Sequence, residues 1–507
     1  MTVSSKSSPK PISRDSFSNL LRGLFKRDPL REVYSAELFQ QLTYMSAISA
    51  AGISRSRIFQ MGGELPLSPA AYFSRVQLFS QKLGYDYARA CSMVGLSIKS
   101  EAMVSLLLRL ATALGSGQPE KDFLAEETLV QGKAYEKEYE TDLSSLTKWT
   151  DAYAAVTVSA TLIVIINMTS SLIYPLSDAM LMGLVTTAAV TAAASAWILS
   201  RAAPKEEIDL FSKDGPWLQR MALKLVYWLV PGVFIICPPL LLLGVHIGWV
   251  TMIAATLLLP LGIVSLMAGG QIDKKDREFG PFLRSLGSMA VSTGTTLAEA
   301  LTRLDISSYP TLSPDLARLR SRLAAAIEPE LCWNKFAQET GSKLIVDTVK
   351  IFHDAVRLGG DPDVVGFMAA DFASRTIMLR AKRKVTASTF IWLTVVMHGV
   401  VAFLMVLIQE IVHNFVLMLQ AATATLDQEA MNTYAAALPS FNAPQIEFFR
   451  YMAIGMVLLL ATINALAIGS TDGGHKLKLA FYFSLMFYMS GAAFLLASPV
   501  VKGLFQS

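Results

Sequence analysis

Residues 45–54 read MSAISAAGIS, and residues 289–296 read MAVSTGTT. Each stretch is apolar and helix-like up to a glycine, and these glycines, Gly52 and Gly294, lie 242 residues apart. A second pair of landmarks keeps nearly the same spacing, because LATALGSGQPE at 110–120 corresponds to AVRLGGDPD at 355–363. Gly117 and Gly360 in these stretches lie 243 residues apart. The sequence therefore predicts a duplicated module, which restricts the fold more than any single residue does.

The composition is that of an integral membrane protein. Mean hydropathy is +0.44, and 53% of the 507 residues are hydrophobic while only 17% are charged. These values lie outside the range of soluble globular chains. Runs of about twenty largely uncharged residues, the length that crosses the hydrocarbon core, occur at 152–174, 176–199, 225–247, 249–267, 387–411, 446–470 and 479–500.

The positions of Lys and Arg predict the orientation, because cytoplasmic loops retain them. With the N-terminus inside, all but two of the 44 basic residues, Arg450 and Lys502, fall in cytoplasmic parts. The external loop 412–445 contains Asp427 and Glu429 and no Lys or Arg. We therefore expect a multi-pass protein of the cell membrane, with the N-terminus and both modules cytoplasmic and the C-terminus external.

Apolar residues in both modules recur at three- and four-residue intervals, without a sustained period of two, which predicts helices. The expected fold class is an all-α polytopic membrane protein with seven spans and two cytoplasmic helical bundles. The chain divides into a basic N-terminal segment 1–34, a first module 35–151, four spans at 152–268 around the loop 200–224, a second module 269–386, and three spans at 387–507 with the loop 412–445.

The N-terminal segment begins with a Ser/Lys/Pro tract that lacks the apolar region of a cleavable signal peptide. It continues with Phe17, Leu20, Leu21, Leu24 and Phe25 among basic residues. Two interpretations remain open for this basic amphipathic stretch. It forms a helix on the inner leaflet, or a helix that packs on the first module.

Local signals define the first turn of each module. In the second copy an apolar stripe ends at Gly294, and Thr296 with Glu299 forms a capping box that restarts the helix. The first copy turns at Gly52 and restarts from Ser54. We therefore expect a helical hairpin in each copy. The residues of the stripe are Phe282, Leu283, Leu286, Met289 and Ala290.

A second turn precedes the helix that enters the membrane. Gly360 supplies the turn, Asp361 the N-cap and Pro362 the first helical residue in the second copy. Gly117 and Pro119 supply the same elements in the first copy, without the strong cap.

This order of elements resembles the F domain of type II secretion and type IV pilus systems: an apolar helix, a glycine, a capped helix, then a long helix ending in Gly-Gly-Asp-Pro and a charged helix entering a span. Two such domains in one chain look most like the platform proteins of archaeal flagella and archaeal type IV pili. Bacterial tight-adherence platform proteins, with one domain per chain, fit less well. The resemblance covers about 35–200 and 275–411. The first copy departs from it at 115–117 and in an acid-rich stretch with Glu136, Glu138 and Glu140.

The resemblance implies a non-enzymatic assembly platform in the cytoplasmic membrane. Such proteins dock through their cytoplasmic modules onto a hexameric secretion ATPase and convert its movement into insertion or extraction of pilin- or archaellin-like subunits. It also implies pairing of F domains. We therefore expect a homodimer, with pairing of the two domains inside one chain as the alternative. Small residues at 188–189 and 192–193, four apart on one helix, would permit close helix approach. Lipid is the remaining expected contact, and no cofactor or nucleic acid is implied.

No catalytic, cofactor or metal site is expected. A Gly-x-x-x-x-Gly-Lys-Ser/Thr phosphate loop is absent from the sequence, so any ATP hydrolysis must come from another chain. Glu410 and His413, one helical turn apart at a membrane boundary, favour a hydrogen bond over a metal site. Cys91, Cys237 and Cys332 have neither a disulfide framework nor zinc-ligand spacing.

Polar residues inside the spans raise a different function, that of a secondary transporter built from internal repeats. His398 lies midway along the fifth span, where an ionisable group is costly. We favour a neutral histidine bonded to a neighbouring helix over a proton relay, because no acid lies deep in another span. Asn167 and Asn464 are expected to bond between helices. Prolines that break the third and fourth spans favour a kinked structural pair over ion sites, because no carboxylates accompany them; they are Pro231, Pro238, Pro239 and Pro260.

The repeats distinguish these two functions, because transporter repeats lie in the spans, whereas these copies lie in soluble segments. Charged residues on the modules are therefore candidates for contact with the ATPase, with a solvated surface as the alternative: Arg55, Arg57, Arg303, Asp305, Arg375 and Arg380. A basic group nearer the fifth span is interpreted as an anchor to anionic lipid, formed by Lys382, Arg383 and Lys384.

Overall fold

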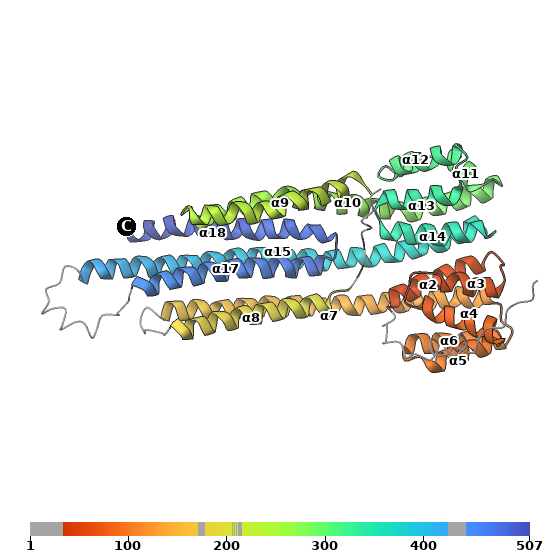
Figure 1. The fold of residues 1–507 in the computed structure, drawn as a ribbon, viewed down its shortest axis with the longest axis horizontal. Coiled ribbons are helices and arrows are strands. Elements are labelled where there is room, and N and C mark those ends of the chain that lie inside the picture. The colour runs from red at the N-terminus through yellow and green to blue at the C-terminus, as the bar shows by residue number, and fades with distance from the viewer. Residues whose placement is uncertain are drawn as a thin grey trace, which may run out of the picture. The chain divides into compact units, whose positions relative to one another are not determined.

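The structure is a computed structural model that describes residues 34–170, 178–204, 206, 208, 210, 215–423 and 443–506. The expected N-terminal amphipathic segment, apart from Tyr34, lies outside the described residues. So do 424–442, which make up most of the expected external loop. Every regular element in the described part is a helix (Figure 1).

Within the described residues, seven helices are long and apolar enough to cross a membrane, which confirms the all-α polytopic fold class. The candidate spans lie within Glu120–Ser170, Ala179–Ala202, Trp217–Leu242, Ile247–Thr293, Pro362–Met418, Glu447–Asp472 and Lys476–Gly503. The corresponding helices are α7 (Glu120–Ser170), α8 (Asp178–Ala202), α9 (Trp217–Leu242), α10 (Ile247–Thr293), α15 (Pro362–Thr423), α17 (Ala443–Asp472) and α18 (Leu479–Gln506).

The soluble helices confirm the duplication element by element. The first copy contains α2 (Ser35–Ser49), α3 (Arg55–Gly63), α4 (Ala70–Leu83), α5 (Tyr87–Ser97) and α6 (Glu101–Gly115), and then α7. The second contains the end of α10, then α11 (Leu297–Arg303), α12 (Ser313–Ala324), α13 (Pro329–Thr340), α14 (Lys343–Arg357) and α15. α3, α5, α6 and α7 each begin 242 residues before α11, α13, α14 and α15, respectively.

The glycine turns follow this register, with one correction. Gly52 and Gly294 have φ of +70° and +62°, as expected for left-handed turns, and Gly117 has φ of +80°. The partner of Gly117 is Gly359, with φ of +97°, and not Gly360. A Cβ on Gly360 would lie 2.9 Å from the carbonyl oxygen of Ala355, so this glycine permits close packing instead. The repeat therefore keeps a spacing of 242 residues throughout, and the apparent spacing of 243 was a slip between adjacent glycines.

The caps of the membrane-entering helices differ between the copies. Asp361 precedes α15 and its carboxylate accepts from the backbone N–H of Asp363 at 2.9 Å, so Pro362 is the first helical residue, as expected. In the first copy α7 begins at Glu120, which places Pro119 one position earlier, at the N-cap. The expectation that Pro119 opens the helix is therefore wrong by one residue.

Three helices run without interruption from a module into a span. They are α7, α10 and α15, of 51, 47 and 62 residues (Figure 1). The expected boundaries at 151, 268 and 386 lie inside these helices, so they mark changes of environment and not ends of elements. α15 continues to Thr423, whereas the sequence predicted that the external loop begins at 412. α9 and α10 likewise continue through the prolines that were expected to break them.

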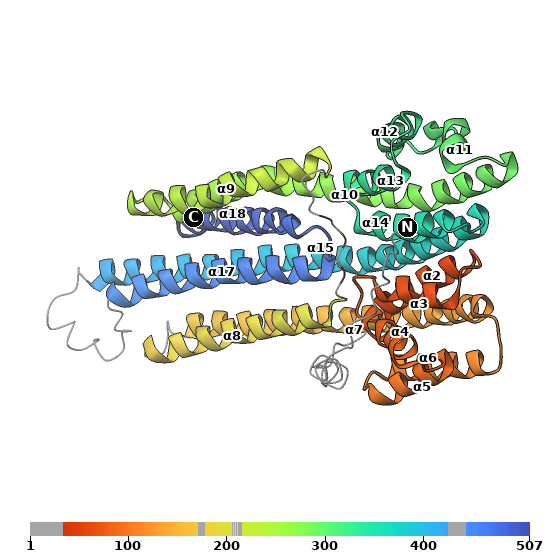
Figure 2. The same cartoon turned by 45° about the vertical axis from the view of Figure 1, so that its right-hand side comes forward.

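The chain forms two compact units. Of the described residues, the first unit combines 34–135 with 286–294 and 350–372, and the second contains those within 136–285, 295–349 and 373–506. In the first unit α5 packs against α6, α3 against α4, and α2 against α3 (Figure 2). In the second, α17 packs against α8 and α18.

The small-residue face of α8 is used within the chain. Ala188 and Ala192 are buried, at 6% and 0% exposure, and α8 packs against α17. Close helix approach therefore occurs inside the chain at Ala188 and Ala192. Ala189 is half-buried and Ala193 is exposed, so dimerisation through this face stays a prediction.

Candidate functional site

Arg380 bridges two carboxylates inside the second unit. Its Nε donates to Glu206 Oε1 at 2.9 Å and its Nη1 to Asp276 Oδ2 at 3.1 Å. Asp276 also accepts from the hydroxyl of Ser342. Arg380 is only 9% exposed, which corrects its placement on an open surface: the guanidinium balances two carboxylates within the chain. Buried ions cost several kcal/mol each unless they are paired in this way.

Arg383 caps the end of α17 and does not face lipid headgroups. Its Nε and Nη2 donate to the carbonyls of Thr471 and Ser470, each at 3.1 Å, and its Nη1 donates to the carbonyl of Pro204 at 2.8 Å. Ser470 and Thr471 lie in the last turn of α17, where carbonyls lack intrahelical partners and positive charge is favourable. Arg383 is 4% exposed, so its expected role as a lipid anchor is replaced by a structural one.

Three ion pairs flank this buried group. They are Arg375–Glu136, Lys382–Glu140 and Lys384–Asp273. The side chains of Lys382 and Lys384 remain 43% and 40% exposed, so they keep access to solvent while holding a carboxylate. Glu136 and Glu140 belong to the acid-rich stretch that distinguishes the first copy. That stretch neutralises part of the basic segment of α15.

The remaining candidates lie on the turns. Arg57 is exposed and donates to Gln60, and Arg303, with 52% side-chain exposure, pairs with Glu299 at 3.1 Å on the same helix. Asp305 is also exposed, and hydrogen bonds from Ser307 lower the pKa of its carboxyl. Arg55 is less available, because its guanidinium pairs with Glu120 at the start of α7. The structure thus leaves Arg57, Arg303 and Asp305 on the surface.

The cap of α11 agrees with the sequence prediction. Thr296 is the N-cap, and its side chain accepts from the backbone N–H of Glu299. Gly294, two residues earlier, supplies the left-handed turn. Arg303 at the end of this seven-residue helix is thereby held beside the turn.

A single hydrogen-bonded chain joins four membrane helices in the second unit. Tyr153 of α7 donates to Asn464 Oδ1 of α17 at 2.5 Å, and Asn464 Nδ2 lies 3.1 Å from His398 Nδ1 of α15. Because an amide nitrogen only donates, His398 Nδ1 accepts and its Nε2 carries the proton, which reaches Ser490 Oγ of α18 at 2.9 Å. Ser490 in turn donates to the carbonyl of Met486. The assignment is a neutral histidine bonded between helices, the interpretation favoured from the sequence.

The two predicted membrane asparagines differ. Asn464 bonds to neighbouring helices as expected, but Asn167 donates to the carbonyl of Ile163, four residues earlier on its own helix. Among the residues that the structure describes, no group of three or more His, Cys, Asp or Glu could hold a metal. The three cysteines are free thiols, and burial raises the pKa of Cys91 to about 12.

Contact between the two copies was not foreseen residue by residue. In the first unit Phe39 of α2 stacks near Phe372 of α15, with ring centroids 5.4 Å apart. Tyr44 donates to Asp354 Oδ2 at 2.9 Å, and Lys350 Nζ lies 5.7 Å from the centre of the Tyr44 ring. One signal was available, since α2 has a single charged residue, Glu37, and so lacks a charged, solvent-facing side.

The same cluster sets the charge of Asp354. Burial would raise the pKa of this carboxyl, but hydrogen bonds from His353, Tyr44 and Lys350, together with the charge of Lys350, lower it to about 2. Burial next to this carboxylate also raises the pKa of the Tyr44 hydroxyl. The contact between the copies is therefore a charge-assisted one.

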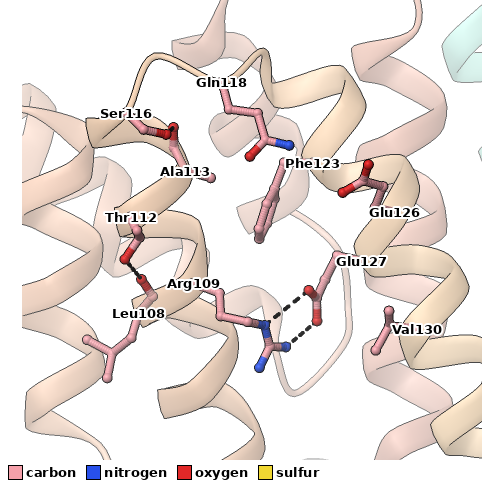
Figure 3. A pocket seen from close by; sticks show the side chains of 10 residues that line it. All are labelled: Leu108, Arg109, Thr112, Ala113, Ser116, Gln118, Phe123, Glu126, Glu127 and Val130. Atoms are coloured by element: carbon pink, nitrogen blue, oxygen red, sulfur yellow. Dashed lines mark hydrogen bonds and ion pairs between the residues drawn. The ribbon is translucent and has the colours of Figure 1, made fainter.

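A groove of about 520 Å³ lies between α6 and α7 of the first module (Figure 3). Arg109 crosses it and donates from Nε and Nη2 to the carboxylate of Glu127. Glu127 is 6% exposed, whereas Glu126 beside it and Val130 one turn further along α7 are exposed. No motif in the sequence marks this groove.

Neither a family model nor a solved structure matches the chain. Two curated relatives do. Flagella accessory protein J of Methanocaldococcus jannaschii is 24% identical over 420 residues, which cover 79% of this chain and 72% of the relative. Flagella accessory protein J of Methanococcus voltae is 23% identical over 447 residues, covering 85% and 78%. Over most of its length this membrane protein is therefore similar to proteins named flagella accessory protein J, which confirms the resemblance to the platform proteins of archaeal flagella.

Proposed function

We propose that this chain is the membrane platform of an archaeal filament assembly machine and couples a hexameric secretion ATPase to the insertion of pilin-like subunits. The relatives named flagella accessory protein J support the assembly role. The observation that carries the coupling role is α15, which begins in the second module at Pro362 and continues as a single helix through a candidate span to Thr423. A continuous helix transmits a displacement of its first turns to the membrane, because its backbone hydrogen bonds resist stretching and bending.

The orientation is part of this proposal. Both modules lie on the cytoplasmic side, because the positions of Lys and Arg favour it. The ATPase must then be a separate chain, since this sequence has no phosphate loop. The two modules, 35–151 and 269–386, are the units that dock onto it. The mature complex contains pilin- or archaellin-like subunits on its membrane side.

The docking surface lies on the turns of the modules. Arg57, Arg303 and Asp305 form its exposed part, and Arg55 contributes its partly exposed edge. Arg375 lies nearer the membrane and is held by Glu136, so it contributes to docking only if that pair opens. Arg380 and Arg383 are excluded from this surface because they are buried.

The test uses the full-length chain in lipid nanodiscs with the hexameric secretion ATPase of the same organism. We expect no ATP hydrolysis by the chain alone and a higher turnover of the ATPase when both are present. Arg303→Glu should abolish this stimulation, because like charges that meet at a water-excluding interface cost several kcal/mol. Arg89→Glu is the matched control, since Arg89 is exposed on α5 and outside the proposed surface.

Two results would count against the proposal. Hydrolysis by the purified chain would show that the activity resides here. Stimulation that survives Arg303→Glu and Arg57→Glu together would remove the turns as the docking surface. Accessibility of Cys substituted at 303 and at 57 to an impermeant maleimide, from the cytoplasmic face only, would test the orientation separately.

A further inference from the structure

The strict register of the repeat relates the groove of the first module to a filled site in the second. Leu108, Thr112 and Val130 line the groove of Figure 3, and their partners 242 residues later are Lys350, Asp354 and Phe372. These three partners are the residues that contact α2, through the ring of Phe39 and the hydroxyl and ring of Tyr44. The second module therefore has the same groove, and α2 occupies it.

Burial differs between the two grooves as this occupancy requires. Phe372 is 6% exposed and Asp354 is 9% exposed where α2 covers them. Val130 is 57% exposed and Thr112 is also exposed at the matching positions of the first module. The third pair does not follow this contrast, because Lys350 is exposed at the edge of the covered groove and Leu108 is half-buried. The contrast at Val130/Phe372 and Thr112/Asp354 is the one expected when a helix covers only the second of two similar grooves.

The helix that would fill a groove also occurs twice. The counterpart of α2 is the last part of α10, residues 277–291, in the same register. On α2 a stripe formed by Phe39, Leu42, Ser46 and Ser49 is buried, with 1% to 4% exposure. The matching stripe on α10 is exposed and consists of Pro281, Arg284, Ser288 and Val291.

The contact between the copies is thus head-to-tail. The first module contributes its stripe, the second contributes its groove, and each chain is left with one open groove and one exposed stripe. A head-to-tail contact that is not closed within one molecule can be repeated between molecules, and two chains can close it reciprocally.

We propose that the α6/α7 groove of one chain receives the α10 stripe of a second copy, and that the two chains exchange this contact reciprocally to form a dimer. The occupant is a second copy because the chain itself contains both halves of the contact and displays their fit once already. This inference does not rest on the proposed ATPase coupling.

Charge complementarity supports this pairing. The contacts Phe39–Phe372 and Tyr44–Asp354 make α2 antiparallel to α15, because α14 and α15 reverse direction at Gly359. Interpolation between these two contacts aligns Leu42 of α2 with Met368, one turn before Phe372. The matching positions in the open pair are Arg284 of the stripe and Glu126 of the groove, both exposed. Two apolar residues at the aligned positions inside the chain thus correspond to two residues of opposite charge at the positions of the open pair.

Disulfide crosslinking between two differently tagged, co-expressed full-length chains tests the geometry. One chain carries Val130→Cys and the other Pro281→Cys, the counterparts of Phe372 and Phe39, whose rings lie 5.4 Å apart. Both carry Cys237→Ser, because Cys237 is the one cysteine among the three that is not buried. We expect a crosslinked species with both tags after oxidation of intact membranes with copper phenanthroline. Leu96→Cys, with 76% exposure on α5, replaces Val130→Cys in the control and should give none.

A charge exchange provides a second measurement that does not depend on cysteine chemistry. Glu126→Arg alone and Arg284→Glu alone should each weaken the dimer about tenfold in nanodiscs, measured by mass photometry, because like charges then meet across the interface. The two changes in one chain should restore it.

The proposal is overturned if the crosslink forms only within one chain or requires residues 1–33, which would make that segment the occupant. It is also overturned if Val130→Cys crosslinks to the ATPase in place of a second copy, or if the charge exchange fails to restore the dimer.

Discussion

Ala326 adopts a left-handed backbone conformation 242 residues after Gly84, which adopts the same one, with φ of +56° and +71°. Gly84 follows the end of α4, and Ala326 follows the end of α12. Each of these helices precedes the fourth helix of its module. The two copies therefore share a left-handed backbone conformation at this position, although only the first copy has the glycine that favours it. Among the described residues, Ala326 is the one non-glycine residue with a positive φ.

Substitution at these two positions should have opposite effects. Ala326→Gly is expected to stabilise the second module by about 1 kcal/mol. The left-handed conformation costs a residue with a Cβ roughly 1–2 kcal/mol, and part of the gain from removing this cost is offset because glycine loses more backbone entropy on folding. Gly84→Ala should destabilise the first module by a similar amount, and only through conformation, because no atom lies within 4 Å of the added Cβ. Amide hydrogen exchange at the ends of α4 and α12 measures both effects. Slower exchange after Gly84→Ala would contradict the assignment.

Removal of the Arg380 guanidinium should destabilise the protein. Arg380→Met leaves Asp276 and Glu206 buried without their cation, which costs about 3–5 kcal/mol. Lys382→Met is the matched control, and the loss of its exposed pair with Glu140 should cost at most about 1 kcal/mol. The measurement is the abundance of each variant in membranes together with its thermal stability in detergent. Equal stability of the two variants would show that Arg380 does not balance these carboxylates.

Asp354 makes the contact between the copies depend on pH. Its pKa in the folded chain, about 2, lies below the unfolded value near 4, so the stabilisation is complete above pH 5 and is lost as pH falls toward 2. The shift corresponds to about 2 kcal/mol. Asp354→Asn should therefore lower stability at pH 7 and approach the parent chain near pH 2–3 in acid titrations of unfolding.

The hydrogen-bonded chain through the spans should behave as a unit. His398→Leu and Asn464→Leu each leave a partner unsatisfied in the membrane, and each should cost about 1–2 kcal/mol in unfolding by mixed detergent. The double variant should cost clearly less than the sum, because both partners of one bond are then removed. Thr462→Val on an exposed face of α17 is the control. Strict additivity would mean that the bond between His398 and Asn464 contributes little.

The sequence predicted the features that depend on local pattern. Apolar runs of the right length located the seven spans, and Gly52, Gly294 and Asp361 marked turns and a cap, because left-handed turns and N-caps are set by the residue itself. Gly359 and Gly360 are adjacent, and nothing local distinguishes which of them takes the positive φ. The register slipped by one residue for that reason.

The candidate site was harder to predict, because it depends on contacts between distant segments. Arg380 and Arg383 look like surface charges in a basic stretch, and their burial follows from Glu206, Asp276 and the end of α17, far away in the sequence. Arg57 and Arg303 were placed correctly on the surface, because their exposure follows from position on a short capped helix.

Because α15 is uninterrupted, the direction in which a side chain projects from its membrane half is fixed relative to the side chains of its module half. Arg380, which holds Asp276, and His398, which accepts from Asn464, are eighteen residues apart, or about five turns at 3.6 residues per turn, so both project from the same azimuth of the helix. Insertion of one residue between them would rotate one anchor by about 100° relative to the other, whereas a seven-residue insertion would nearly restore the angle and lengthen the rod by about 10 Å. The number of residues between Arg380 and His398 therefore sets the angle between these two side chains around the helix axis, whichever residues occupy the stretch.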